Sequence, residues 1–293
     1  MEGILNWGVD VILRFQQFSP TLDPPFRLLT FLGEEEFFLL LLPFIYWCLD
    51  RRMGARLTIL FLLSAYLNSV AKVLAGQPRP FEYTSQVRPL VEAHGGGLPS
   101  GHTQNTVAVW GYLAAQFRRT WLWILAGLLM VLVPLSRVYL GVHFPTDLLG
   151  GYLIGAALVL LYLWAEPEGE RWLDGKGFTW QLGLALAAPL LLVLLFPTTD
   201  GVTAGATMAG MGVGFVLERR WVGFDSGGIG WKRALRYLLG VLVLFGLWMG
   251  LRVAFAGLEP ALLFRFVRYG LVGLWGGLVA PWTFVHLRLA ERK

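Results

Sequence analysis

The chain of 293 residues has very little cysteine and little charge. Its one cysteine, Cys48, lies in an apolar stretch, so the chain can form no internal disulfide and has no cysteine-rich metal site. Charged residues make up 15% of the chain, against about 25% in a soluble domain. A mean hydropathy of +0.60 and several apolar runs of about 20 residues predict a polytopic membrane protein instead.

The first 20 residues lack the basic region that opens a cleavable signal peptide, since they carry Glu2 and Asp10 near the start. Four apolar residues of this stretch fall on one helical stripe: Ile4, Trp7, Val11 and Phe15. This spacing predicts a helix over residues 4–18 that lies on the bilayer surface. An ordinary capping helix would give the same pattern.

Apolar segments predict an all-α bundle of about nine transmembrane helices. The segments are 36–49, 55–75, 102–118, 121–142, 146–165, 180–197, 202–218, 233–256 and 263–288. A polar stretch at 166–179 divides the chain, which predicts an N-terminal interfacial segment (1–35), a chemical core (36–165) and additional spans (166–293).

The net charge of +5 comes from basic residues at the ends of apolar runs, which suits lipid head groups and not nucleic acid. With nine spans, most of the 24 basic residues fall on one side. These are Arg51, Arg52, Arg56, Arg118, Arg119, Arg171, Lys176, Arg219, Arg220, Lys232, Arg233, Arg236, Arg288, Arg292 and Lys293. The positive-inside rule makes that side, and the C-terminus, cytoplasmic.

The last 128 residues (166–293) hold glycine and alanine at close spacing, which lets helix backbones approach closely in lipid. They are Gly201, Ala204, Gly205, Ala206, Ala209, Gly210, Gly212 and Gly214, then Gly270, Gly273, Gly276 and Gly277. We expect a packing scaffold here, which could also line a substrate path or form a homo-oligomer contact.

Three polar clusters stand beside apolar runs of the front part, where charge is costly. The first is Lys72 with Arg79 between two prolines, and the second is 99–102, where Ser100 and Gly101 open a helix before His102. A helix start and fixed cations are groups that bind phosphate. Alone, the first cluster could be a snorkelling pair, and the second a capped helix with an incidental histidine.

The third cluster is Ser136-Arg137, followed by His143 and, four residues later, Asp147. On a helix this spacing puts the carboxylate beside the imidazole, where it sets the tautomer and stabilises the charged form. An ordinary salt bridge would give the same spacing. The topology places all three clusters on the non-cytoplasmic face.

Taken together, the clusters resemble the three-part signature of the type 2 phosphatidic acid phosphatase superfamily. The matching residues are Lys72-x6-Arg79-Pro80, Pro99-Ser100-Gly101-His102 and Ser136-Arg137-x5-His143-x3-Asp147. The resemblance implies an integral membrane phosphatase that needs no metal or cofactor. His143 would be the nucleophile that forms a phosphohistidine, Asp147 its orienting partner and His102 the acid. The resemblance also assigns the phosphate oxygens to Lys72, Arg79, Ser100, Gly101 and Arg137.

A further likeness to the sphingosine-1-phosphate phosphatase branch extends to both sides of this core. It rests on Gly33-Glu34-Glu35-Glu36, Leu42-Pro43-Phe44, Trp47, Asp50, Pro197-Thr198-Thr199-Asp200 and Phe266-Val267-Arg268-Tyr269. Glu34, Glu35 or Glu36 could contact a substrate head group that carries an ammonium, although acids that set a helix start are common.

The lipid attached to the phosphate stays open. A sphingoid phosphate, a phosphatidic acid and a polyprenyl diphosphate all suit a site at the bilayer surface. Two other functions also stay open, a phosphatase for a water-soluble ester such as a sugar phosphate and a lipid transporter or flippase. A halide-oxidising enzyme that holds vanadate in the same site is disfavoured, because such relatives are soluble.

Overall fold

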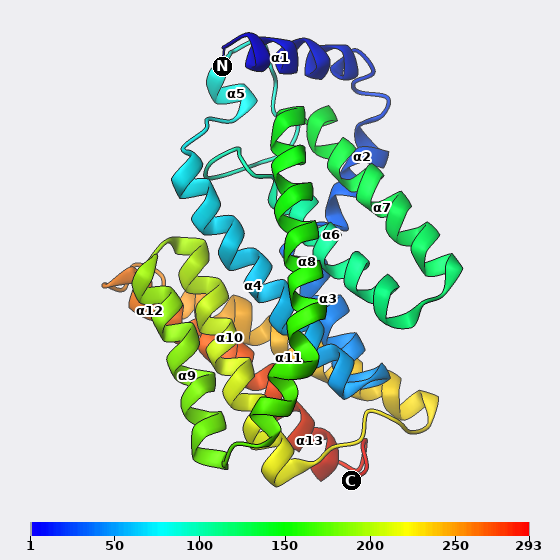
Figure 1. Cartoon of the computed structure of the whole chain (residues 1–293), viewed down its shortest axis with the longest axis vertical. Coiled ribbons are helices and arrows are strands. Elements are labelled where there is room, and N and C mark those ends of the chain that lie inside the picture. The colour runs from blue at the N-terminus through cyan, green and yellow to red at the C-terminus, as the bar shows by residue number, and fades with distance from the viewer. Residues whose placement is uncertain (1, 293) are drawn as a thin grey trace. The chain divides into compact units, whose positions relative to one another are not determined.

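A computed structural model describes residues 2–292, and within that range helices are joined by turns and loops, with one isolated bridge between Phe224 and Arg292 and no strand (Figure 1). The α-helices are α1 (Glu2–Gln16), α2 (Asp23–Phe31), α3 (Glu35–Phe44), α4 (Arg51–Ala75), α5 (Pro80–Tyr83), α6 (Gly101–Phe117), α7 (Thr120–Tyr139), α8 (Pro145–Asp174), α9 (Phe178–Leu195), α10 (Thr199–Leu217), α11 (Gly230–Ala254), α12 (Ala261–Leu274) and α13 (Ala280–His286). Three wider turns of π-type are η1 (Ile45–Leu49), η2 (Glu218–Val222) and η3 (Trp275–Val279). The all-α prediction is confirmed.

Six helical stretches in residues 2–292 are long and apolar enough to cross a membrane. They are Arg51–Tyr83, Thr120–Tyr139, Pro145–Asp174, Phe178–Leu195, Gly230–Ala254 and Ala261–His286. Each coincides with a segment predicted from hydropathy. The chain is therefore a multi-pass membrane protein, and the predicted count of nine spans is not confirmed.

The other three predicted spans are helices that differ from the six in length or polarity. α3 runs into the π-type turn η1, and α6 has 17 residues and buries Thr103, Gln104 and Thr106. α10 is a continuous 19-residue helix that is rich in glycine and alanine. Short or polar helices of this kind pack inside a bundle, where neighbouring helices satisfy their polar groups.

By compactness the chain forms two units, unit 1 (residues 1–38 and 67–165) and unit 2 (residues 39–66 and 166–293). Unit 1 contains every cluster singled out from the sequence. The domain boundaries predicted at 35/36 and 165/166 were drawn from the positions of the motifs and of a polar stretch. The division into compact units does not test them, and they stay a prediction.

In unit 1, α1 is a helix as predicted, and it packs on the protein mainly through a face other than the stripe that was predicted to lie on the bilayer. The position of that stripe on the bilayer stays a prediction. Leu5, Val9 and Ile12 are buried in a cluster with Val138 and Phe144. Burying each such side chain contributes about 1.5–3 kcal/mol. On the predicted stripe, by contrast, Ile4 is 57% and Trp7 53% exposed.

Glycines bring α8 against the start of α6, which assembles the site. A Cβ on Gly151 would lie 2.7 Å from the carbonyl oxygen of Ser100, and one on Gly155 would lie 2.9 Å from that of Gln104. Larger residues would hold the two helices apart. The same approach lets the backbone N–H of Ser100 donate to the carbonyl oxygen of Asp147 at 2.9 Å.

In unit 2, the predicted close helix packing is confirmed, because α10 packs on α9 and α12 through small residues. A Cβ on Gly273 would lie 2.5 Å from the carbonyl oxygen of Thr207. Tyr46 and Trp47, both buried, donate from their ring groups to the carbonyl oxygens of Gly277 (3.2 Å) and Gly276 (3.0 Å). These contacts form the core of unit 2.

Candidate active site

The three clusters meet within unit 1, at the ends of its helices. Lys72 is in the last turn of α4 and Arg79 immediately precedes α5. His102 is in the first turn of α6, and Arg137 is in the last turn of α7. His143 lies between α7 and α8 and is within electrostatic range of all four. The structure therefore brings the predicted histidines and cations together around one imidazole.

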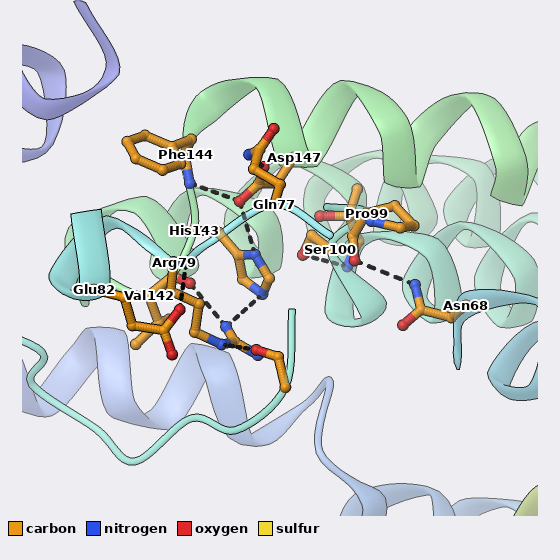
Figure 2. Close-up of polar contacts among 12 residues, drawn as sticks. Asn68, Gln77, Arg79, Glu82, Pro99, Ser100, Val142, His143, Phe144 and Asp147 are labelled. Carbon is orange, nitrogen blue, oxygen red and sulfur yellow. Dashed lines mark hydrogen bonds and ion pairs between the residues drawn. The ribbon is translucent and has the colours of Figure 1, made fainter. Parts of the chain in front are cut away.

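His143 is held by Asp147, as the sequence spacing predicted. Its Nδ1 lies 3.1 Å from Oδ2 of Asp147, which also accepts from the backbone N–H of Phe144 at 2.9 Å (Figure 2). The other carboxylate oxygen accepts from Nε2 of Gln77 at 2.6 Å. Since a carboxylate only accepts, Nδ1 carries the proton and Nε2 presents its lone pair on the opposite edge of the ring.

Arg79 faces that lone pair and is fixed by carbonyl groups. Its Nη1 is 3.3 Å from Nε2 of His143 and donates to the carbonyl oxygen of Val142 at 2.8 Å. Its Nη2 and Nε donate to the carbonyl oxygens of His94 (2.7 Å) and Gly95 (2.9 Å). Neutral acceptors leave the positive charge of the guanidinium intact beside the imidazole.

His143 is 2% exposed. Burial lowers its pKa well below the ordinary value of 6.5, and the nearby charges of Arg137, Arg79 and Lys72 lower this pKa further. The ring is therefore neutral at neutral pH, as a nitrogen nucleophile must be.

Ser100 and Gly101 open α6 as predicted. The hydroxyl of Ser100 caps the helix by accepting from the backbone N–H of Thr103 at 3.4 Å. Asn68 supports this turn through its Nδ2, which donates to the carbonyl oxygen of Pro99 at 3.3 Å and to Oε1 of Gln104 at 2.9 Å. A helix N-terminus fixed in this way offers partial positive charge to an anion.

Arg137 and His102 retain buried nitrogens without a protein partner. Arg137 is 4% exposed and donates from Nη1 to Oγ1 of Thr30 at 2.5 Å, while its Nε has no partner among the described residues. Nε2 of His102 is likewise buried without one. Buried polar groups usually have partners, and a bound phosphate ester would supply them here.

The three acids before α3 differ in position. Glu34 is partly buried and within electrostatic range of Arg137 and Glu36. Burial raises the pKa of Glu34, Glu36 raises it further, and Arg137 opposes the rise. Glu36 is also partly buried, whereas Glu35 is exposed. Glu34 is therefore coupled electrostatically to a phosphate-binding candidate.

The sequence reasoning missed three residues that contact the motif residues. Gln77 binds Asp147 and stands two positions before Arg79, and Asn68 lies one helical turn before Lys72, on the same face. Their spacing from the motif could have indicated both. Thr30 lies far from every motif in sequence, so no local signal marked it.

The chain matches two family models in tandem. Residues 54–170 match the PAP2 superfamily, and residues 202–292 match the "PAP2 superfamily phosphatase, transmembrane extension". The first match contains all three clusters, and the second covers the glycine-rich spans of unit 2.

Two relatives and one crystal structure give the same assignment. The chain is 31% identical over 208 residues to sphingosine-1-phosphate phosphatase 2 of Mus musculus, which is 66% of this chain but only 58% of that protein's length. It is 31% identical over 251 residues to glucose-6-phosphatase 3 of the same species, which covers 77% of this chain and 71% of the relative.

The crystal structure is that of a transmembrane PAP2-type phosphatidylglycerolphosphate phosphatase from Bacillus subtilis. It aligns with a TM-score of 0.50 and 27% identity, over 57% of this chain and 88% of that one. Together with the three-cluster site, these similarities show that the chain belongs to the PAP2 superfamily.

Proposed function

We propose that this protein is a membrane phosphatase that hydrolyses a lipid phosphate through a phosphohistidine on His143. The single observation that carries the proposal is the setting of His143. Nδ1 faces a buried carboxylate at 3.1 Å, and Nε2 faces a fixed guanidinium at 3.3 Å. A neutral imidazole beside an anion-binding group can attack a phosphate that the guanidinium holds.

In the first step, the lone pair on Nε2 of His143 attacks phosphorus, and the bond from phosphorus to the alcohol oxygen breaks. His102 is buried beside Arg137, Lys72 and Arg79, which disfavour its charged form in the free site. The bound phosphate dianion offsets those charges, and the protonated ring of His102 then gives its proton to the leaving oxygen. Asp147 stabilises the positive charge that develops on the His143 ring. The products are a free alcohol and a phosphohistidine.

In the second step, His102, now neutral, takes a proton from water as the water oxygen attacks phosphorus. The phosphorus–nitrogen bond breaks, its electron pair returns to Nε2 of His143, and inorganic phosphate leaves. Lys72, Arg79 and Arg137, with the capped turn at Ser100 and Gly101, stabilise the charge on the equatorial oxygens. These cations supply the electrostatic work that other phosphatases assign to a metal ion, so no metal enters the scheme.

Two features favour a lipid substrate. The sphingosine-1-phosphate relative and the phosphatidylglycerolphosphate phosphatase both act, by name, on lipid phosphates. Beside the loop that holds Arg79 lies a hollow of about 480 Å³, lined mostly by apolar side chains. Its lining is Phe81, Pro89, Leu90, Val91, Glu92, Ala93 and His94. Such a surface suits an alkyl chain better than a hydrated sugar.

Within the lipid class, Glu34 favours a substrate with an ammonium near the phosphate, such as a sphingoid base phosphate. A partly buried carboxylate near Arg137 can contact the ammonium while the arginine contacts the phosphate. Glu34→Gln should then reduce kcat/KM for the ammonium-bearing lipid relative to phosphatidic acid. Glu35→Gln, at an exposed position, is the matched control, and an unchanged substrate ratio in Glu34→Gln would remove this assignment.

A sugar phosphate is the second candidate. The match to glucose-6-phosphatase 3 covers 77% of this chain, more than the 66% covered by the sphingosine relative. A phosphate-release panel of purified wild type separates the two, with lipid phosphates in mixed micelles against soluble sugar phosphates. We expect kcat/KM to be highest for a lipid, and His143→Ala to release no phosphate from any substrate. Preference for the sugar phosphate would replace the lipid assignment, and release by His143→Ala would overturn the mechanism.

We also propose that the site faces away from the cytoplasm and that the C-terminus is cytoplasmic, because most basic residues outside the clusters lie on the other predicted side. Cys48 is buried, so an added cysteine reports its own accessibility. In intact cells, a membrane-impermeant maleimide should label Glu92→Cys, in the exposed loop before the site, and should not label Arg288→Cys. The reverse labelling would invert the topology.

A further inference from the structure

The corner between α2 and α3 lies against the site, although it is outside the 54–170 stretch that matches the PAP2 superfamily. α2 packs along α7 within unit 1, and the chain turns at Gly33 before α3 begins at Glu35. Two residues of this corner touch groups assigned to the reaction, Thr30 and Gly33. We define the α2–α3 corner as residues 30–34.

Gly33 lies against the imidazole of His102. A Cβ at this position would lie 2.6 Å from Cδ2 of His102, 3.1 Å from its Cγ and 3.0 Å from Cγ1 of Val133. Real Cβ atoms essentially never show the first of these distances. Gly33 is not among the glycines with positive φ, so close contact with the ring, and not backbone conformation, is what requires glycine here.

Thr30 lies on the guanidinium of Arg137. Its side chain is 2% exposed, and Oγ1 accepts from Nη1 of Arg137 at 2.5 Å. A hydroxyl holds the arginine in one orientation and leaves its charge available to a phosphate, whereas a carboxylate in its place would neutralise that charge. The Nε of Arg137 keeps its capacity to donate.

We propose that the α2–α3 corner is a fourth component of the active site, in which Gly33 positions the ring of His102 and Thr30 positions the guanidinium of Arg137. The proposal rests on the phosphatase function proposed above. Both are positioning residues, since each acts through another side chain. Displacing the His102 ring would move Nε2, the buried nitrogen left to reach a substrate, away from the leaving oxygen.

Dependence on the leaving group tests the role of Gly33. An alkoxide needs a proton as it leaves, whereas 4-nitrophenolate leaves without one, so a misplaced acid slows only the first reaction. General acid catalysis contributes roughly 10²–10⁴-fold, and we expect Gly33→Ala to lower kcat/KM by at least about tenfold for an alkyl phosphate. For 4-nitrophenyl phosphate the loss should stay below about threefold. kcat/KM is the right quantity because it covers the steps up to departure of the alcohol.

Gly127→Ala is the matched control, since a Cβ there meets nothing within 4 Å. It should leave both substrates unaffected. In a His102→Ala background, Gly33→Ala should cause no further loss with the alkyl phosphate. Equal losses on both substrates, or an additive loss in that background, would overturn the positioning role.

Thr30 gives a second test that does not depend on Gly33→Ala folding. Thr30→Val keeps the shape and removes the acceptor, so it should weaken inhibition by vanadate and raise KM for both substrates by about tenfold, the value of one lost hydrogen bond to a charged group. Thr30→Ser should restore both. Unchanged vanadate inhibition in Thr30→Val would contradict the role of Thr30. If wild type releases phosphate from neither substrate, the proposed function fails. If wild type is active and the Gly33→Ala and Thr30→Val variants match it, only the role of the α2–α3 corner is rejected.

Discussion

Two half-buried arginines of unit 2 and two buried arginines of unit 1 have different partners. In unit 2, Arg51 binds the buried carboxylate of Glu218 at 3.0 Å, and Arg56 binds Glu166 at 2.8 Å and Glu170 at 2.5 Å. In unit 1, neither Arg79 nor Arg137 has a carboxylate within ion-pair distance among the described residues. Their partners are carbonyl groups, the hydroxyl of Thr30 and Nε2 of His143.

The difference is between arginines whose charge is neutralised by a carboxylate and arginines whose charge is not. A buried charge that is paired with an opposite charge contributes to structure, whereas one held by neutral dipoles keeps its field for a ligand. Arg236 of unit 2 is buried and is also held by carbonyl groups, those of residues 225–227, so neutral partners alone do not mark a site. Arg79 and Arg137 differ from Arg236 because both lie within electrostatic range of His143.

The largest effect that we expect is a loss of activity without a loss of stability when an arginine of unit 1 is replaced. Arg137→Met should lower kcat/KM by about 10³-fold, because it removes a group that stabilises the transition-state charge. It should leave thermal stability nearly unchanged, since no buried carboxylate loses a partner. Activity and melting temperature in detergent measure the two effects separately.

Arg51→Met should show the opposite pattern. Leaving Glu218 buried without its partner should destabilise the protein by up to about 3 kcal/mol, while turnover per folded molecule stays near that of wild type. Glu218→Gln in the same background should restore part of the stability. Loss of turnover in Arg51→Met at full stability would contradict the division between the units.

The carboxylate of unit 1 should act through the imidazole. Asp147→Asn should lower kcat by roughly 10³-fold, because an amide can donate to Nδ1 and so favours the wrong tautomer of His143. Gln77→Met, which frees the other carboxylate oxygen of Asp147, should cost only about tenfold, the value of one hydrogen bond to a charged group. Equal effects of the two variants would mean that Asp147 is not specifically required.

Some parts of the fold and of the candidate site could be predicted from the sequence. The histidines and cations of each cluster stand at short spacings, and Ser100 is a serine, a residue type that often caps a helix. The clusters and the helix start at Ser100 could therefore be predicted from local sequence. Hydropathy predicted nine spans, and six of them coincide with helices that are long and apolar enough to cross a membrane. α6 and α10 are largely buried within their own units and need not be as apolar as a lipid-facing helix. The sequence predicted that residues 4–18 form a helix with an apolar stripe. It could not predict that Leu5, Val9 and Ile12 pack on the protein, because that depends on the position of Phe144, which is distant in sequence.

The parts that could not be predicted depend on long-range contact. Thr30 meets Arg137 across 107 positions, and Gly33 meets His102 only because α2 packs on α7. Neither residue type carries a chemical signature, and only the fold brings them to the site.

The pH profile gives a smaller effect that tests the electrostatics of unit 1. Because burial and the nearby cations lower the pKa of His143, its ring loses the lone pair only when the pH falls well below 6.5. We therefore expect any fall in kcat/KM that comes from protonation of His143 to lie well below pH 6.5. The pH profile would contradict a neutral nucleophile if kcat/KM fell on the acid side with a midpoint above pH 6.5 and this fall persisted when each of the other histidines was replaced.

The central claim is tested most directly by trapping the intermediate. Wild type mixed with ³²P-labelled substrate and quenched rapidly in alkali should carry label that is stable in base and lost in acid, and peptide mapping should place it on His143. His143→Ala should carry none, and His102→Ala should retain label on His143 longer, because water attack slows. Label on any other residue of an active enzyme, or its persistence in His143→Ala, would contradict the account.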